Sequence, residues 1–430
     1  MRSKKIGPNY CPFNIKLCMQ NFKIKASLFL NYFVFAILLN SVGTVILQVQ
    51  GNFDITKSAA SVLEAFKDLS IAATSFVMAS YIVRIGYKNA MLIALGTVSM
   101  ICFIVPSVPS FVMTKLLFAC VGFGFALVKV SVFATIGLVT KDKKEHLSLM
   151  NFLESFFMIG ILCGYFLFSY FVDNDNLKSQ AWLQVYYLIG GLAVLAFLLL
   201  LFTKIDDREI KAAANIENKD ASQDFMGMLR LITIPLVLVF ILSAFFYVLV
   251  EQSIMSWLPT FNNDILHISK SLSIQMASIL SLSFAIGRFL AGVILKRFDW
   301  LFVLLGCLAL SAAIVLLIVP LSKDLGNEAI TNFKDVPFVA FAFPVIGLFL
   351  APIYPAINSV ILSHLPKTKH AAMTGLIVVF SALGGSTGSI ITGNIFERYG
   401  GQTAFYFSLF PISLMAVLLI LFKKLSLKAN

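Results

Sequence analysis

The sequence predicts an all-α membrane protein with twelve transmembrane helices in two six-helix halves, and two observations predict it. Of the 430 residues, 59% are hydrophobic and only 13% are charged, whereas soluble domains contain about 45–50% apolar and about 25% charged residues. The apolar residues also gather in twelve runs, most of them close to the about 20 residues that a helix needs to cross the hydrocarbon layer. No soluble fold buries so much apolar surface.

The twelve runs follow one another almost end to end. Residues 192–202 are apolar at every position, unlike the alternating strands of a membrane barrel, so helices are the remaining way to satisfy the backbone in lipid. The second and third runs are short, but residues 61–66 and 87–89 can extend them. The predicted spans are Ser27–Val49, Leu69–Val83, Ala90–Val105, Phe111–Val139, Leu147–Val172, Leu183–Thr203, Ile234–Leu258, Leu272–Leu295, Leu301–Leu321, Val336–Leu362, Ala371–Phe396 and Ala404–Phe422.

The distribution of Lys and Arg predicts the orientation. When alternate loops are assigned to opposite sides, most of the basic loop residues, including both ends of the chain, fall on one side. The positive-inside rule places that side in the cytoplasm. The formal net charge of +12 is therefore a topology signal and does not indicate nucleic-acid binding. No Asn-x-Ser/Thr acceptor site occurs in the chain, which favours a bacterial inner membrane.

A charged segment divides the spans into six and six. Between Lys204 and Arg230 the composition changes from apolar to charged, as expected of a solvated linker. A short helix along the membrane is an alternative for this segment, supported by its i, i+4 charge pairs. The predicted parts are a cytoplasmic N-terminal segment (1–26), an N-terminal half (27–203), a linker (204–233), a C-terminal half (234–422) and a cytoplasmic tail (423–430).

The two halves correspond at three places. Basic residues follow both the second span (Arg84, Lys88) and the eighth (Lys296, Arg297), and glycines recur in the fourth and tenth spans. The fifth span contains Gly160-x3-Gly164, and the eleventh contains Gly384, Gly385, Gly388 and Gly393. Small residues at such spacing allow helix backbones to approach closely. A duplicated six-helix unit explains all three correspondences.

Twelve spans in two halves, cytoplasmic ends, a charged central loop and a basic turn after spans two and eight together resemble the major facilitator superfamily. Arg84, Gly86 and Lys88 match the superfamily's turn after the second span, while Ala79 and Val83 replace its glycine and aspartate. The resemblance implies transport by alternating access and a gating role for the basic turns. The residues assigned to gating are Arg84, Gly86, Lys88, Arg288 and Arg297.

A looser similarity connects segments 35–48 and 351–358 with the fucose–galactose–glucose proton symporters. This similarity implies proton-coupled symport of a sugar. The two acids that fucose-type members place in spans one and four fall here at Gly43 and about Leu127. The sequence therefore departs from that family at both positions.

Four ionisable residues lie well within predicted spans: Lys129, Glu154, Glu251 and Arg288. Burying one costs about 2.5–3.5 kcal/mol on insertion scales, so each is a functional candidate. Lys129 and Glu154 are at similar depths in adjacent spans, where they either form a static ion pair or handle substrate or protons. Glu251 has no cation nearby in sequence, which suits a proton carrier. Arg288 is assigned to topology or gating.

Polar residues from spans one, five, seven and ten are candidates for a central site near the midplane. Amides beside aromatic rings suit a polyhydroxylated ligand. Pro259, Pro352 and Pro355 are expected to interrupt helices there. The predicted substrate-binding residues are Asn40, Gln48, Lys129, Asn151, Gln252, Trp257, Tyr354 and Asn358, and the predicted proton-coupling residues are Glu251 and Glu154.

The sequence thus predicts a monomeric secondary transporter of a small polar solute, driven by protons and containing no cofactor or metal. The sequence contains no Gly-x4-Gly-Lys-Ser/Thr phosphate-binding loop, so ATP is not expected to be the energy source. A sugar follows from the family similarity, whereas Lys129 favours an organic anion or amphoteric solute, and export of drugs or metabolites is a further alternative. A membrane-embedded enzyme is a remote alternative, because the four His residues are isolated in loops and form no metal cluster. A non-transporting sensor is also remote, because such a protein would usually add a soluble domain and none is present.

Overall fold

The computed structural model describes residues 15–140, 143–176, 178–205, 230–295, 297–323, 329–364 and 370–429. These residues are almost entirely helical. Eleven helices in this part of the chain are long and apolar enough to cross a membrane, and α4 (Val62–Ile85), which carries more charge, supplies the twelfth pass. The predicted twelve-helix fold is confirmed. Residues 206–229, most of the predicted linker and its alternative short helix, lie outside the described residues.

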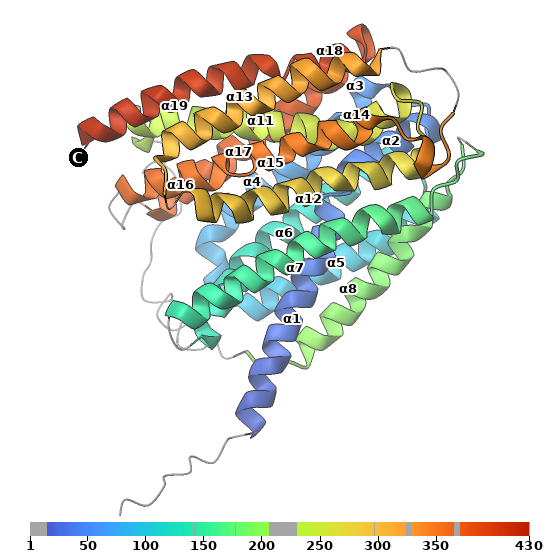
Figure 1. Ribbon diagram of the computed structural model, residues 1–430. Helices are drawn as coiled ribbons and strands as arrows, with labels where there is room; N and C mark the ends of the chain where they lie inside the picture. Colours follow the sequence, from blue (N-terminus) through green and yellow to red (C-terminus); the bar gives the residue numbers. More distant parts are fainter. Residues whose placement is uncertain are drawn as a thin grey trace, which may run out of the picture.

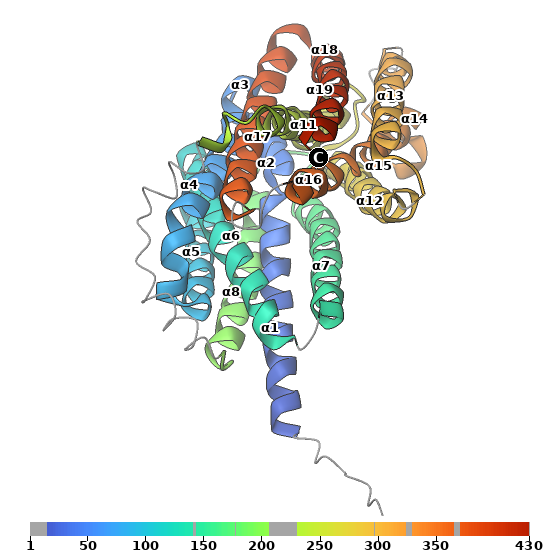
Figure 2. The same ribbon diagram turned by 90° about the vertical axis from the view of Figure 1, so that its left-hand side faces the viewer.

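The helices pack in two groups, which Figures 1 and 2 show as mostly blue-to-green and mostly yellow-to-red ribbons. The first group consists of α1 (Ile15–Leu39), α2 (Val42–Asn52), α3 (Lys57–Ala60), α4, α5 (Tyr87–Ser107), α6 (Phe111–Val139), α7 (Lys143–Tyr170), the 3₁₀ helix η1 (Ala181–Gln184) and α8 (Val185–Leu201). The second consists of α11 (Pro235–Asp264), α12 (Lys270–Ile294), α13 (Trp300–Ile318), η2 (Val319–Ser322), η3 (Phe333–Asp335), α14 (Phe338–Ala342), η4 (Phe343–Val345), α15 (Ile346–Leu350), α16 (Ile353–His364), α17 (His370–Tyr399), α18 (Gly401–Tyr406) and α19 (Leu409–Ala429).

The first and tenth passes are broken helices. The first pass is split between α1 and α2 at Asn40–Ser41, where the Ser41 hydroxyl donates a 2.7 Å hydrogen bond to the Leu38 carbonyl. The tenth pass is interrupted at Ala351–Pro352, so the prediction for Pro352 is confirmed. Pro355 lies in the first turn of α16, where a missing N–H has no cost.

The predicted interruption at Pro259 is wrong, because α11 continues through it to Asp264. A proline inside a membrane helix is tolerated when neighbours shield the carbonyl that it leaves without a donor. Here that carbonyl belongs to Met255, and a Cβ on Gly43 of α2 would lie 2.9 Å from it. The close approach of α2 therefore covers the defect.

Glycines let the helices pack at short range, as their spacing predicts. A side chain at Gly384 or Gly388 of α17 would collide with the α11 backbone at Phe245 or Leu249, and one at Gly160 of α7 would collide with Ala36 of α1. Absence of a Cβ thus brings α17 against α11 and α7 against α1. These contacts stabilise each group, because packing rather than water exclusion drives helix association in lipid.

The two groups meet along a seam formed mainly by α4 with α17, α2 with α11, and α7 with α12. We call the end of the bundle that contains Asp54 and Asp264 the hairpin end, and the opposite end, which contains Leu201 and Lys423, the terminal end. The hydrogen bonds and ion pairs that join two described residues across the seam all lie toward the hairpin end. They are Lys57–Asp264 (2.9 Å), Ser58–Glu397 (2.6 Å), Ser58–Asn394 (2.8 Å), Gln50–Thr260 (3.4 Å), Ser61–Ser389 (3.4 Å), Glu64–Ser256 (2.8 Å), Ser169–Ser271 (2.9 Å), Ser169–Gln275 (3.2 Å) and Asn174–Ser271 (3.0 Å). The hairpin end is therefore the closed end.

Candidate functional site

Three buried charges that the sequence did not single out lie in α4. The helix begins at Val62, in agreement with the possible extension over residues 61–66, so the residues before Leu69 are inside the bundle. Glu64 lies one helical turn before the consecutive residues Lys67 and Asp68, and the three side chains are 0%, 6% and 10% exposed. We call these three residues the α4 charge cluster.

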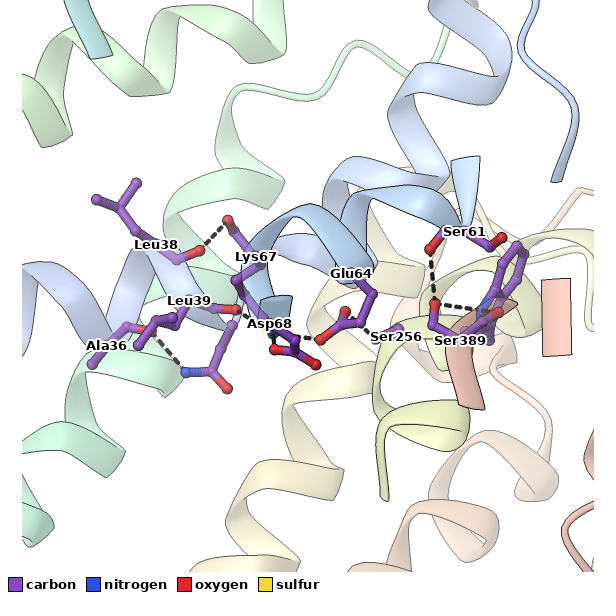
Figure 3. Close-up of polar contacts among 12 residues, drawn as sticks. Ala36, Leu38, Leu39, Ser61, Glu64, Lys67, Asp68, Ser256 and Ser389 are labelled. Carbon is purple, nitrogen blue, oxygen red and sulfur yellow. Dashed lines mark hydrogen bonds and ion pairs between the residues drawn. The ribbon is translucent and has the colours of Figure 1, made fainter. Parts of the chain in front are cut away.

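Lys67 is the centre of the α4 charge cluster (Figure 3). Its ammonium donates to Glu64 Oε1, lies 3.5 Å from Asp68 Oδ1, and lies 3.5 Å from the carbonyl of Leu39. Leu39 is the last residue of α1, and the break that follows it leaves its carbonyl without a helical donor. The broken first pass thus supplies a backbone acceptor to a buried cation, a role that interrupted membrane helices can have.

The cluster is also part of the seam. The Ser256 hydroxyl of α11 donates a 2.8 Å hydrogen bond to Glu64 Oε2 (Figure 3). On α17, Gly385 lies directly against the Asp68 carboxylate, where any side chain would displace it. Two helices of the second group, α11 and α17, therefore contact the charged side chains of α4 directly.

A second set of polar groups surrounds Glu251 in α11. Tyr247 donates a 3.1 Å hydrogen bond to Glu251 Oε1, and Arg288 Nη2 of α12 lies 4.0 Å from the same oxygen. The Tyr247 ring stacks on Tyr354 at a centroid distance of 5.4 Å, and the Tyr354 hydroxyl is 3.0 Å from Ser381 Oγ. Glu251 therefore has a cationic neighbour, Arg288, which the sequence around Glu251 does not reveal.

Lys129 and Glu154 are close enough to interact electrostatically but form no ion pair within 4.0 Å in the described structure. Tyr32 of α1 donates to Glu154 Oε1 at 3.5 Å, while Lys129 is exposed and its ammonium lies 5.7 Å from the centre of the Phe125 ring. Lys129 is also within electrostatic range of Arg288 across the seam. The two predicted partners therefore lie in one electrostatic network without a direct bond.

The two sets are connected through Gly385 of α17, because a Cβ there would lie close to both the Asp68 carboxylate and the Gln252 side chain. The Gln252 side chain follows Glu251 along α11 and lies beside Gly385. The structure thus brings together Lys129, Glu154, Glu251, Arg288 and four further residues. Those four are Gln252, Tyr354 and the acids of the α4 charge cluster, Glu64 and Asp68.

The other predicted substrate contacts are placed separately. Trp257 is fully buried, and its indole N–H donates to the carbonyl and hydroxyl of Ser389 in α17. Asn40 donates to the Ala36 carbonyl at the break in the first pass (3.0 Å). Buried Gln48 has an amide nitrogen, and half-buried Asn358 an amide oxygen, without a hydrogen-bond partner in the described chain. The side chain of Asn151 lies outside the described residues.

Apart from Arg288, the predicted gating residues lie at the terminal end. Gly86 joins α4 to α5 with φ of 91°, a conformation that favours glycine. Lys88 donates a 2.9 Å hydrogen bond to the Leu201 carbonyl at the end of α8, and Arg297 is exposed after α12. The Arg84 side chain lies outside the described residues.

The α4 charge cluster was not predicted, although residues 61–66 were expected to be able to extend the second span, because its three charges lie before the apolar run that begins at Leu69. A signal was available, since two acids and a lysine at i, i+3 and i+4 spacing share one helical face. That pattern is also common on solvated helices, so burial is what distinguishes it.

Comparison with known proteins identifies the fold. The family profile described as Major Facilitator Superfamily matches residues 28–329. A curated relative, "Protein TsgA homolog" of Buchnera aphidicola subsp. Baizongia pistaciae (strain Bp), is 23% identical over 287 residues, which is 65% of this chain and 64% of the relative. The chain therefore matches just under two thirds of that protein's length.

Solved transporter structures share the fold over nearly the whole chain. A variant of the nucleoside transporter NupG superposes with a TM-score of 0.70 at 14% identity, covering 94% of this chain and 99% of that one. A D-xylose-proton symporter gives 0.69 at 15% identity, with coverages of 93% and 96%. FucP, crystallised in the outward conformation, gives 0.59 at 16% identity, with coverages of 94% and 99%. At these identities the likeness establishes the fold alone.

Proposed function

The chain belongs to the Major Facilitator Superfamily, and from this premise we propose that it is a secondary transporter that moves a small polar solute together with protons. The observation that carries the proposal is the network of ionisable groups along the seam, of which Glu64, Lys67 and Asp68 are buried. Each such group has a large cost in a membrane and is retained where it works. A seam that must open and close is where such groups respond to solute and protons.

We propose a polyhydroxylated solute, such as a sugar. Half-buried Tyr354, which stacks on the buried Tyr247 ring, offers an aromatic ring, and Gln252 and the unpaired Asn358 oxygen offer hydrogen bonds. Such sites bind sugars by stacking and by amide hydrogen bonds. Two of the similar structures, a nucleoside transporter and a D-xylose-proton symporter, are named for hydroxylated solutes, which supports this choice of solute class.

An organic anion is the second candidate, and Lys129 favours it. Its ammonium has no carboxylate within 4.0 Å in the described structure, and Arg288 adds a second positive charge nearby. A carboxylate or phosphate group on the solute would bridge these two cations with charge-assisted hydrogen bonds. Binding by both cations would also bring the two helix groups together around the solute.

The proposed orientation follows from the basic loops. We place the terminal end, both chain ends and the linker 204–233 in the cytoplasm of a bacterial inner membrane. The closed hairpin end then faces outward, and residues 27–203 and 234–422 are the two units that rock about the seam. The protein acts as a monomer in this proposal and catalyses no covalent step.

Uptake into proteoliposomes tests the proposed function. Purified protein is reconstituted and supplied with labelled sugars, nucleosides, organic acids and amino acids, with and without an inward proton gradient. We expect one class to accumulate above equilibrium only with the gradient, and a protonophore to abolish the accumulation. Equilibration without gradient-driven accumulation would exclude proton coupling, and no uptake of any class by folded protein would count against transport of these solutes.

A further inference from the structure

The α4 charge cluster contains an excess acid that the proposed solute site does not use. Two carboxylates share one ammonium, so the cluster carries one negative charge when all three groups are ionised. All three side chains are at most 10% exposed. A net charge in such surroundings is costly, and one bound proton removes it.

Glu64 already has partners for both of its oxygens. Oε1 accepts from Lys67, and Oε2 accepts from Ser256 at 2.8 Å. Asp68 has only the longer 3.5 Å contact with Lys67 through Oδ1, and its Oδ2 faces the backbone of Gly385. Of the two carboxyl groups, Asp68 therefore has fewer donors that would stabilise its ionised form.

The groups that face Asp68 come from several helices. On α4 itself they are Glu64 and Lys67, and α11 contributes Glu251. From α7, the phenol of Tyr165 lies within electrostatic range of Glu64 and Lys67. In the described structure, α17 contributes Gly385 and no charge, and α1 contributes the Leu39 carbonyl. The nearby charges are thus two carboxylates and one ammonium.

Building on the proposed proton-coupled transport, we propose that Asp68 is a proton-binding site that controls closure of the hairpin end. With a proton on Asp68, the Lys67–Glu64 pair is neutral, and α17 and α11 close over the cluster. Loss of that proton leaves like charges in a dry seam, and their repulsion favours separation and entry of water.

The proton moves only between water and the Asp68 carboxyl oxygen, so an O–H bond is the one bond made or broken. Glu251 is the acid of α11 that interacts electrostatically with Asp68. Its side chain is 16% exposed. Asp68 links the proton gradient to the state of the hairpin end.

Distance measurements between spin labels test the proposal. Asp175 and Lys334 are exposed at the hairpin ends of the two groups, and both are replaced by labelled cysteine in a chain without its six native cysteines. In the parent we expect a short distance at pH 5 and a growing long-distance population toward pH 8. In Asp68→Asn, which stays neutral, the short distance should persist and this pH-dependent shift should be lost.

Asp54→Asn is the matched control, because Asp54 is an exposed hairpin-end acid whose left-handed backbone (φ 51°) an asparagine tolerates. It should shift with pH as the parent does. A melting curve confirms that Asp68→Asn is folded. The proposal is overturned if the parent shows no pH-dependent shift, or if Asp68→Asn shifts or stays open like the deprotonated parent.

Uptake by the same variants separates this proposal from the proposed function. Gradient-driven uptake that persists in Asp68→Asn would overturn the role of Asp68 and leave proton-coupled transport standing. Parent protein that transports without any effect of the gradient would overturn proton coupling itself. Loss of gradient-driven accumulation in Asp68→Asn alone supports both.

Discussion

The Ser256 hydroxyl of α11 donates a 2.8 Å hydrogen bond to the fully buried Glu64 carboxylate of α4, and so joins the two helix groups at the α4 charge cluster. Ser256 is itself only 2% exposed. A buried carboxylate that loses a donor cannot replace it with water at no cost. This bond therefore stabilises both the cluster and the closed hairpin end.

Ser256→Ala tests the contribution of this bond. We expect a loss of about 1–3 kcal/mol, because one oxygen of a buried carboxylate is left without a donor. Thermal unfolding in detergent should show a lower melting temperature. Ser413→Ala is the control, since that exposed hydroxyl bonds only to the Leu409 carbonyl of its own helix. Equal melting temperatures for the two variants would contradict the expectation.

Gly388→Ala tests the close packing of α17 on α11. The added methyl group would meet the Leu249 backbone and Ser253 Oγ, 2.9 Å away, and overpacking typically costs about 1–3 kcal/mol. The melting temperature should fall. Gly191→Ala in α8 has no atom within 4 Å of the new methyl, so its melting temperature should stay equal or rise. A stable Gly388→Ala protein would show that the helices separate without cost.

Lys129→Ala tests the charge proposed to face the solute. Uptake should fall by about 10- to 100-fold, equivalent to the about 1.5–3 kcal/mol of a charge-assisted hydrogen bond, with normal membrane insertion. Lys115→Ala in the same helix removes a lysine that packs over Phe111 near the hairpin end and should leave uptake unchanged. Undiminished uptake in Lys129→Ala would remove Lys129 from the site.

Glu251→Gln tests proton coupling at the second acid. The amide keeps the hydrogen bond from Tyr247 and cannot release a proton, so we expect exchange of solute to continue while gradient-driven accumulation disappears. Both are measured in the same proteoliposomes, with exposed Asp175→Asn as the control. Normal accumulation by Glu251→Gln would exclude Glu251 as a coupling group.

Asp299 provides a pH-dependent test outside the spans. The Lys423 ammonium, 2.7 Å away, lowers the pKa of Asp299 below its ordinary value. Because folding lowers this pKa, its stabilisation is complete above the unfolded pKa of about 3.9 and is lost as the pH falls through the folded pKa. Asp299→Asn should therefore melt slightly below the parent at pH 7, and the difference should close in acid. A difference that is independent of pH would indicate a cause other than charge.

Much of the fold could be predicted from the sequence, because span number depends on local composition. The length of each apolar run determines whether a helix crosses the bilayer, and glycine spacing along 384–393 predicted close packing. Pro259 was predicted wrongly, because the shielding of Met255 comes from Gly43, far away in the chain. The ionisable candidates Lys129, Glu154, Glu251 and Arg288 were found because a charge in an apolar run is conspicuous.

What the sequence by itself determined is the set of twelve helices and the short list of charges within them, since both depend on transfer of a local segment into lipid. Only the tertiary structure decided which charges meet. Glu251 faces Arg288 from the next helix, and Glu64 faces Ser256 from the other helix group. The faces that two helices present to each other depend on packing across the whole bundle, and no local pattern contains that information. The burial of Asp68, on which the proposed proton site depends, was likewise decided by the tertiary structure.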